Sequence, residues 1–235
     1  QTHNGIGMAR FYNTLTGVTT MQPTNINSNW QTEWMGDLAH ELDKKERWEL
    51  KSSVKLTYLH SNDLVQEAKT EVPISSMSLS TVRNFYTNAS VGINYRSKPL
   101  NAGLQVRLDW QHATSQRANF TTLNNKDISS TFTLLAKLPW KVEIASDITL
   151  FSRRGYADHS MNSDEWIWNA SIEKRLLKNS ALSFKCSAVD LLAQRRNVER
   201  KVNAQGYTET WYNTIPRYLL FTLSYRFHKA PKRKY

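Results

Sequence analysis

Apolar and polar residues alternate with a period of two along most of the chain, as side chains do on the two faces of a β-strand. In the segment 30–42, for example, Trp34 and Leu38 lie on one face while Glu33 and Asp37 lie on the other. The same clear alternation recurs in 48–58, 84–96, 104–111, 128–140, 142–150, 166–175, 182–188 and 219–227. A weaker alternation covers roughly 8–22. Together these segments predict about ten strands.

The length of these segments separates a membrane barrel from a soluble sheet. They run for about 9–14 residues, whereas strands of soluble proteins typically have about 5–6 and a tilted membrane-crossing strand needs about 9–11. Tryptophans lie near the ends of several stripes, as in the aromatic girdles of outer-membrane barrels. They are Trp30, Trp48, Trp140 and Trp166. We therefore predict an all-β fold, an antiparallel transmembrane β-barrel over residues 1–227.

The predicted connections alternate between short and long. Short turns fall at 43–47, 97–103, 139–141 and 177–180. Longer polar loops fall at about 60–80, 112–127, 152–165 and 193–216. Short turns on one side and long loops on the other are typical of the periplasmic and extracellular ends of an outer-membrane barrel. The sequence therefore predicts residence in the outer membrane of a Gram-negative bacterium, with residues 228–235 as a basic periplasmic tail.

The apolar stripes carry almost no charge at mid-strand, whereas the opposite faces carry charges of both signs. We expect Leu134 and Val91 to meet lipid and Thr133 and Ser90 to face the interior. A Lys or Arg facing lipid at the midplane costs roughly 2–4 kcal/mol, so this asymmetry is the one that a membrane wall requires.

Composition adds few candidates for chemistry. The net charge of +11 is dispersed, and no aromatic-interleaved basic groove suggests nucleic acid as a partner. The six histidines are scattered without metal-site spacing, so we expect neither a metal nor a cofactor. Cys186 is the only cysteine, and its apolar neighbours favour a packing role.

Two pairs at the predicted extracellular rim deserve comparison with barrel-rim proteases: His60 with Asp63, and Asp158 with His159. Sequence alone cannot show the convergence that a base and nucleophile need, and polar loop residues explain them better, so we predict no enzyme and no catalytic residue. Aromatic residues in the predicted outer loops are candidates for stacking on a sugar or another planar ligand, with loop packing as the alternative. These candidates are Tyr156, Tyr207, Trp211 and Tyr212.

The C-terminal third carries a resemblance in three segments. They are Asn169–Lys178, then Ala188–Leu192 with Arg195–Val198, and finally Arg217–Phe227. Together they resemble the close of Bacteroidetes outer-membrane β-barrel proteins, a family that includes TonB-dependent receptors, and Leu42–Glu46 is more loosely similar to earlier periplasmic turns. The resemblance marks alternate residues of the last strand as the signal read by the barrel assembly machinery: Leu219, Phe221, Leu223, Tyr225 and Phe227.

The resemblance implies an active importer of a large nutrient, driven through TonB, with about 22 strands, a plug and a surface lipoprotein partner. This sequence has only about ten predicted strands and shows neither a plug nor a TonB-contacting segment, so we expect it to be the C-terminal part of a larger barrel. The basic tail beyond Phe227 also departs from a terminal aromatic. Two alternatives stay open: a self-contained ten-stranded barrel acting as a small pore, adhesin or rim protease, and a soluble basic β-protein that binds an anionic polymer.

Overall fold

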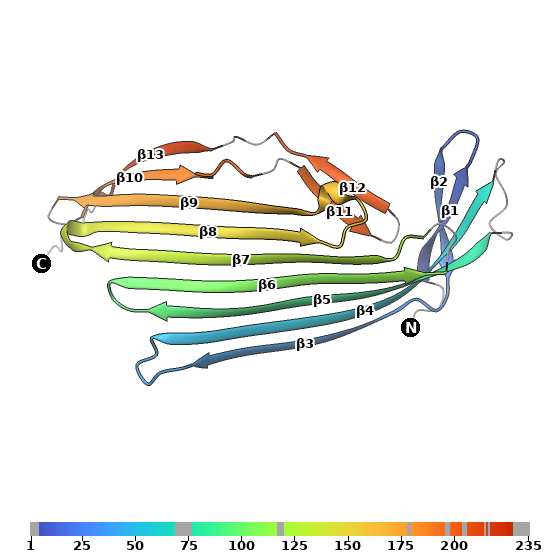
Figure 1. The fold of residues 1–235 in the computed structure, drawn as a ribbon, viewed down its shortest axis with the longest axis horizontal. Helices are drawn as coiled ribbons and strands as arrows, with labels where there is room; N and C mark the ends of the chain where they lie inside the picture. Colours follow the sequence, from blue (N-terminus) through green and yellow to red (C-terminus); the bar gives the residue numbers. More distant parts are fainter. Residues whose placement is uncertain are drawn as a thin grey trace, which may run out of the picture.

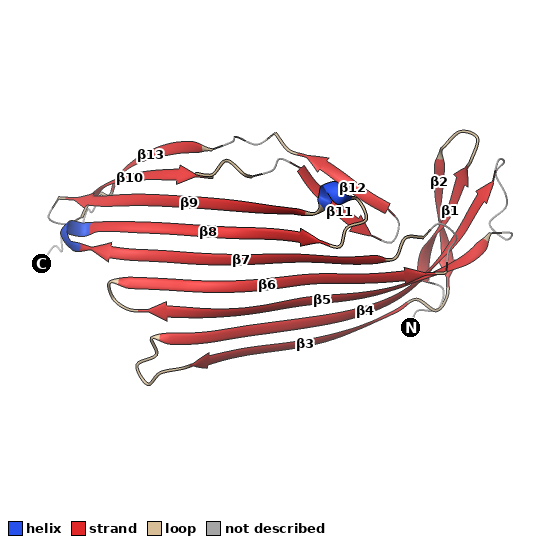
Figure 2. Cartoon of the chain, in the orientation of Figure 1, coloured by secondary structure: helices blue, strands red, loops and turns tan. Residues whose placement is uncertain are grey.

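The computed structural model describes residues 5–68, 77–116, 120–177, 180–195, 198–203, 206–213, 215 and 217–227. The described chain is built from strands (Figure 2). They are β1 (Gly5–Asn13), β2 (Thr19–Ile26), β3 (Trp30–Glu41), β4 (Trp48–Ala68), β5 (Ser78–Arg96), β6 (Leu100–Ser115), β7 (Leu123–Leu138), β8 (Val142–Arg154), β9 (Ser163–Leu176), β10 (Leu182–Val189), β11 (Val198–Asn203), β12 (Gly206–Trp211) and β13 (Tyr218–Tyr225). Two short 3-10 turns complete them, η2 (Pro139–Lys141) and η3 (His159–Met161). No described helix is long and apolar enough to span a membrane.

A single curved wall of long strands dominates the molecule (Figure 1). Its order is β3-β4-β5-β6-β7-β8-β9-β10-β13, and every neighbouring pair in it is antiparallel. The short turns and β13's end lie at one end of the wall, and the longer connections lie at the other, which we call the outer end. The wall is open, because β3 pairs only with β4 and β13 only with β10 within the described residues.

The register separates an apolar face from a polar face across the whole wall. One row runs through Leu50, Ile93, Leu104, Phe132, Ile148 and Trp168. The next row, on the opposite face, runs through Lys51, Gly92, Gln105, Thr131 and Thr149. The same pairing puts Leu134 and Val91 on the apolar face and Thr133 and Ser90 on the polar face, as the alternation predicts.

Two levels of aromatic side chains bound the apolar face of β4. Trp48 packs on Tyr95 near the turn end, with 4.8 Å between ring centroids, and Tyr58 lies 5.1 Å from Trp30 toward the outer end. Ten residues separate Trp48 from Tyr58. At about 3.4 Å per residue and a tilt of about 35–45°, this spacing corresponds to a height of about 24–28 Å. The height matches the apolar band of outer-membrane barrels, which is about 25 Å.

The strands continue well beyond the upper aromatic level. β4 extends to Ala68 and β5 begins at Ser78, so much of the predicted loop 60–80 is strand. β6 and β7 likewise cover most of the predicted loop 112–127, and the β11–β12 hairpin occupies part of 193–216. These expectations were wrong because polar residues at strand ends look like loops in the sequence, although their backbones pair. The tail 228–235 lies outside the described residues.

The weak stripe at 8–22 is not one strand but the hairpin β1–β2. The carboxamide oxygen of Asn13 accepts hydrogen bonds from the backbone N–H groups of Leu15 and Thr16, and Gly17 adopts a φ of 71°, so the chain reverses there. The hairpin does not lie in the row of wall strands, since β1 pairs in parallel with the outer part of β4. Asn62 of β4 fixes the following connection by donating its amide to the carbonyls of Asn27 and Ser28.

The closest packing lies at the outer end rather than along the wall. Most of the buried apolar side chains gather there: Ala9, Phe11, Ile26, Val82, Ala113, Leu123, Tyr156 and Met161. The wall itself is one sheet thick, so its apolar side chains remain exposed in the isolated chain. Such an arrangement is stable only if lipid covers that face.

The short turns are held by local hydrogen bonds. In the first, the carboxylate of Asp43 accepts the backbone N–H groups of Arg47 and Trp48 and the guanidinium of Arg47. The hydrogen bond from the Trp48 backbone, followed by the side chain of Arg47, lowers the pKa of Asp43 below its ordinary value. In the turn between β7 and β8, Trp140 and Lys141 both adopt a positive φ, and the side chain of Trp140 projects outward with 82 % of its surface exposed.

Candidate functional site: the polar inner face and its outer rim

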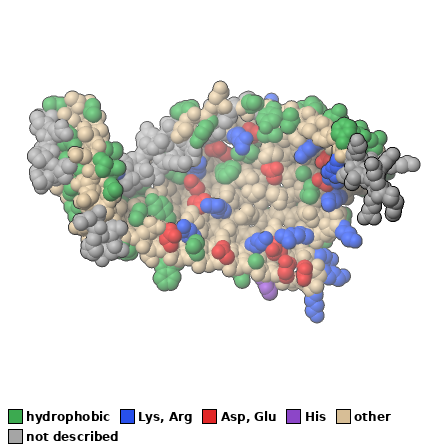
Figure 3. Space-filling view, turned by 180° about the vertical axis from the view of Figure 1, so that it is seen from behind, with side chains coloured by type: hydrophobic (Ala, Val, Ile, Leu, Met, Phe, Trp, Pro, Cys, Tyr) green, Lys and Arg blue, Asp and Glu red, His purple; other side chains and the backbone are tan. Residues whose placement is uncertain are grey.

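The polar face of the wall carries a ladder of ion pairs. Two of these pairs, Lys55–Glu33 and Arg175–Glu143, join neighbouring strands, and the other three join residues two positions apart on one strand. The N···O distances are 3.0 Å for Lys55–Glu33, 3.0 Å for Lys51–Glu49, 2.9 Å for Arg107–Asp109, 3.2 Å for Arg175–Glu173 and 3.5 Å for Arg175–Glu143. Figure 3 shows basic and acidic side chains intermixed over one face of the molecule. Such a surface favours water and polar solutes over lipid.

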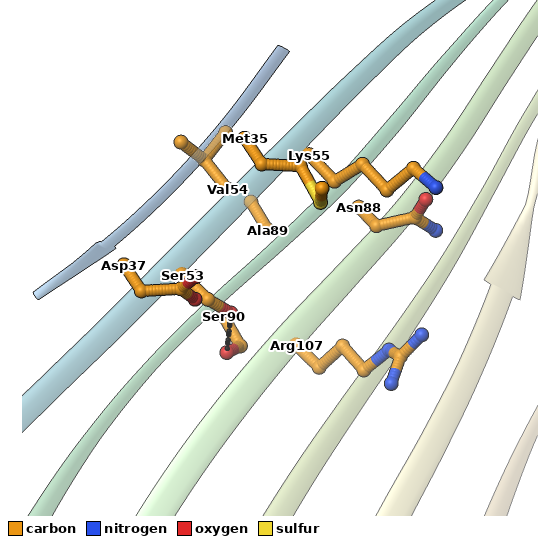
Figure 4. A pocket seen from close by; sticks show the side chains of 9 residues that line it. All are labelled: Met35, Asp37, Ser53, Val54, Lys55, Asn88, Ala89, Ser90 and Arg107. Atoms are coloured by element: carbon orange, nitrogen blue, oxygen red, sulfur yellow. Dashed lines mark hydrogen bonds between the residues drawn. The ribbon is translucent and has the colours of Figure 1, made fainter. Parts of the chain in front are cut away.

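A hollow of about 180 Å³ lies on this face, where β3, β4, β5 and β6 run side by side (Figure 4). Its floor holds the hydroxyls of Ser53 and Ser90, which are hydrogen-bonded to each other at 2.8 Å. Lys55 and Arg107 lie at its margin with Asp37. Hydroxyls and charges of both signs can exchange hydrogen bonds with a passing solute, so the hollow suits a water-filled lumen.

The rim at the outer end is built around a buried tyrosine. The hydroxyl of Tyr156 donates to the carboxylate of Asp127, with O···O distances of 2.8 and 2.9 Å. Burial and then this carboxylate raise the pKa of Tyr156 above its ordinary value. Gly155 makes the turn possible, since its φ is 80° and a Cβ there would come within 2.1 Å of the Asn124 carbonyl oxygen. Tyr156 therefore fastens the β8–β9 connection to β7.

A second rim loop follows β10, where the chain leaves the sheet at Asp190. The buried Asp190 carboxylate accepts the backbone N–H groups of Gln194 and Arg195. The loop then covers the edge of β9, because Leu191 N–H donates to the Trp168 carbonyl and the Gln194 side chain accepts from Trp166 N–H. Hydrogen bonds from this loop thus replace the strand pairing with β9 beyond Ala188, and they give the segment Ala188–Leu192 a structural role.

The four loop aromatics do not form one exposed group. Trp211 and Tyr212 are exposed, by 67 % and 47 %. The expectation of an exposed ring is wrong for Tyr156, which is 9 % exposed and already bonded to Asp127. The side chain of Tyr207 lies outside the described residues. Sequence reasoning missed Asp127 as a partner, and no local pattern could have identified it, since 29 residues separate it from Tyr156.

Comparison with known families agrees with this geometry. Residues 37–225, about four-fifths of the chain, match the outer membrane protein beta-barrel family. The chain belongs to this family. Comparison with curated proteins and with solved structures gives no match. As a member of the outer membrane protein beta-barrel family, the protein resides in the outer membrane of a Gram-negative bacterium.

Family membership gives the two faces of the wall their environments. The face of Leu50 and Phe132 meets lipid, and the face of the ion pairs lines the interior. β13 fits this assignment, because Phe221 pairs with Cys186 and Leu223 with Phe184 on the lipid side. The residues named for the assembly signal therefore share that face within β13, while Phe227 follows the strand and packs edge-on to Tyr225 at 4.5 Å.

The histidine–aspartate pairs considered for catalysis do not come together around a nucleophile. His60 lies on the lipid-side face of β4, stacked 5.7 Å from the ring of Trp30, whereas Asp63 lies on the other face and pairs with Arg10 at 3.6 Å. Asp158 instead caps η3, accepting the backbone N–H of Ser160. No group of three or more His, Cys, Asp or Glu able to hold a metal lies among the described residues.

Proposed function

We propose that this chain is the C-terminal part of a TonB-dependent-receptor-like importer of the Bacteroidetes type, supplying barrel wall and extracellular rim for the uptake of a large nutrient. The resemblance of Asn169–Lys178, Ala188–Leu192 and Arg217–Phe227 supports the receptor type. The single observation that carries the proposal is the open wall, whose two edges β3 and β13 have no partner among the described residues. Unpaired backbone groups are not tolerated in hydrocarbon, so both edges must pair with further strands.

The directions of the edge strands argue against simple closure. Trp30 pairs with His60 at the outer end and Tyr225 pairs with Leu182 at the turn end, so β3 and β13 both run from the outer end toward the turns. Joining them would create a parallel pair in a barrel of nine wall strands. Bacterial single-chain barrels have an even number of antiparallel strands. We therefore infer that an odd number of additional strands completes the wall.

A second copy of the same chain would not supply them. In a symmetric pair around a common barrel axis, β13 of one copy would lie beside β3 of the other, and these strands again run in the same direction. The required partners are strands of different sequence, which agrees with a larger barrel that is wide enough for a large solute.

The test is whether nutrient uptake depends on TonB. The gene is deleted in its native bacterium, TonB is inactivated in a second strain, and growth is compared on a panel of oligosaccharides and metal chelates as sole sources. We expect a nutrient whose use is lost with the gene to be lost equally without TonB and to be restored by the gene on a plasmid. Wild-type uptake of that nutrient without TonB would contradict the proposal and favour a passive pore.

A further inference from the structure

Two cations lie directly opposite each other on the lipid-side face, near its outer limit. Lys126 of β7 and Arg154 of β8 are register partners, and both are exposed. The row continues on β6 to Trp110. Below this row the same face carries only apolar and small polar residues on β7 and β8, so the pair is exceptional. Like charges directly opposite each other are destabilising unless an anion lies between or above them.

The height of this pair coincides with a headgroup layer. Lys126 is twelve residues from Leu138 at the turn end of β7, and Arg154 is twelve residues from Val142 on β8. At about 3.4 Å per residue and a tilt of about 35–45°, these spans rise about 29–33 Å. The apolar band takes up about 25 Å of that height, which leaves the two cations just beyond it.

The hydrogen bonds and ion pairs within the described residues do not neutralise both cations. The Arg154 guanidinium donates to both carboxylate oxygens of Asp164, at 2.7 and 2.9 Å, and to the carbonyls of Arg153 and Ser163. Lys126 makes no hydrogen bond or ion pair with any described residue. Two cations thus face one carboxylate. Beside them, the Trp110 indole N–H donates to the side-chain oxygen of Asn124 at 2.8 Å, which holds an aromatic ring at the boundary.

We propose that Lys126 and Arg154 form a binding site for the phosphate of a glycolipid in the outer leaflet, the lipid A portion of lipopolysaccharide. Phosphorylated glucosamine is the characteristic anion of that leaflet, and the pair faces lipid at its depth. The Lys ammonium supplies a point charge and the Arg guanidinium supplies directed donors, which suits a phosphate oxyanion. The acyl chains then lie along the apolar stripe below, from Ile128 to Phe132. This site depends on membrane residence and not on the transport function.

The test measures lipid binding by the full-length protein purified from outer membranes in mild detergent. Lipid A with its phosphates is titrated and bound lipid is counted by native mass spectrometry. Neutralising both cations, Lys126→Gln with Arg154→Gln, should weaken binding at least about tenfold, since charge-assisted hydrogen bonds to phosphate are lost. The conservative pair Lys126→Arg with Arg154→Lys should bind within about threefold of wild type.

The matched control makes the same charge change on the same two strands but on the inner face, Lys137→Gln with Arg153→Gln. It should bind lipid A as wild type does. Equal weakening in this control, or no weakening in the neutralised pair, would overturn the site. So would equal affinity for dephosphorylated lipid A or for phosphatidylglycerol. If the neutralised pair does not fold, Lys126→Gln alone, whose lysine has no described partner, should still weaken binding several-fold, and unchanged binding would count against the site.

Discussion

The contact between Tyr156 and Asp127 ties the rim to the wall. It joins a loop residue to a strand 29 positions away, and both partners would be left with unmet hydrogen bonds if it broke. Because the pKa of Tyr156 is raised above its ordinary value of about 10, the contact stabilises the fold fully below about pH 10 and is lost as the pH rises toward the pKa in the folded protein.

Replacing this hydroxyl should therefore have a measurable, pH-dependent cost. We expect Tyr156→Phe to lower the free energy of unfolding by about 1–3 kcal/mol at pH 8, because the Asp127 carboxylate loses a partner at a buried site. The difference from wild type should shrink in strongly alkaline buffer, as urea unfolding of the full-length protein in lipid vesicles would measure. Tyr12→Phe on the exposed side of the β1–β2 hairpin serves as the control, and an equal effect there would contradict the assignment.

Each wall strand divides its residues between two environments, and β7 shows the contrast at adjacent positions. Leu134 lies on the lipid-side face near mid-height, whereas Thr133 lies on the inner face beside Asn94 and Gly103. The inner side offers an open hollow of about 230 Å³ at this point, lined by Thr133 among others. A long charged side chain therefore finds water at one position and hydrocarbon at the other.

We accordingly expect Leu134→Arg to cost roughly 2–4 kcal/mol of unfolding free energy, and Thr133→Arg much less. Urea titration of the full-length protein refolded into vesicles would give both values, and the folded fraction can be read from heat-dependent mobility on a gel. Because the two positions are neighbours on one strand, the effects of an arginine on strand propensity and on barrel assembly should be similar at both. Equal costs would contradict the assignment of the two faces, and reversed costs would show that the register of β7 is displaced by one residue.

For the whole wall, the strand order and the strand directions predict that β3 and β13 are not neighbours. A disulfide scan in native outer membranes tests it in a Cys186→Ser background. Cysteines at Trp34 with Leu219, and at Leu38 with Leu223, should not crosslink within one molecule. Cysteines at Ser53 and Ser90, whose hydroxyls are 2.8 Å apart, should crosslink efficiently. This pair is the positive control that the oxidant forms disulfides in the wall.

An efficient β3–β13 crosslink in a heat-resistant monomer would overturn the larger barrel. It would favour the alternative of a self-contained small barrel acting as a pore, adhesin or rim protease. That alternative needs a parallel closing pair or one further strand within the chain itself, because both edge strands run toward the turns.

The sequence by itself determined the wall: its strands, their faces and the short turns between them. A period of two is a local property, and because lipid and lumen impose it on every crossing, Leu134 and Thr133 can be assigned without knowing their neighbours. The turn at Asp43 is equally local, since its carboxylate bonds residues only four and five positions away.

Only the tertiary structure decided what depends on pairing between distant segments. The polar ends of β4 and β5 look like loop residues until their backbones are seen to pair, and the β1–β2 hairpin takes its place only through the parallel pairing of β1 with β4. The burial of Tyr156, the opposition of Lys126 and Arg154, and the common direction of β3 and β13 follow from register and strand order. These are set by long-range contacts, which alternation along one strand does not encode.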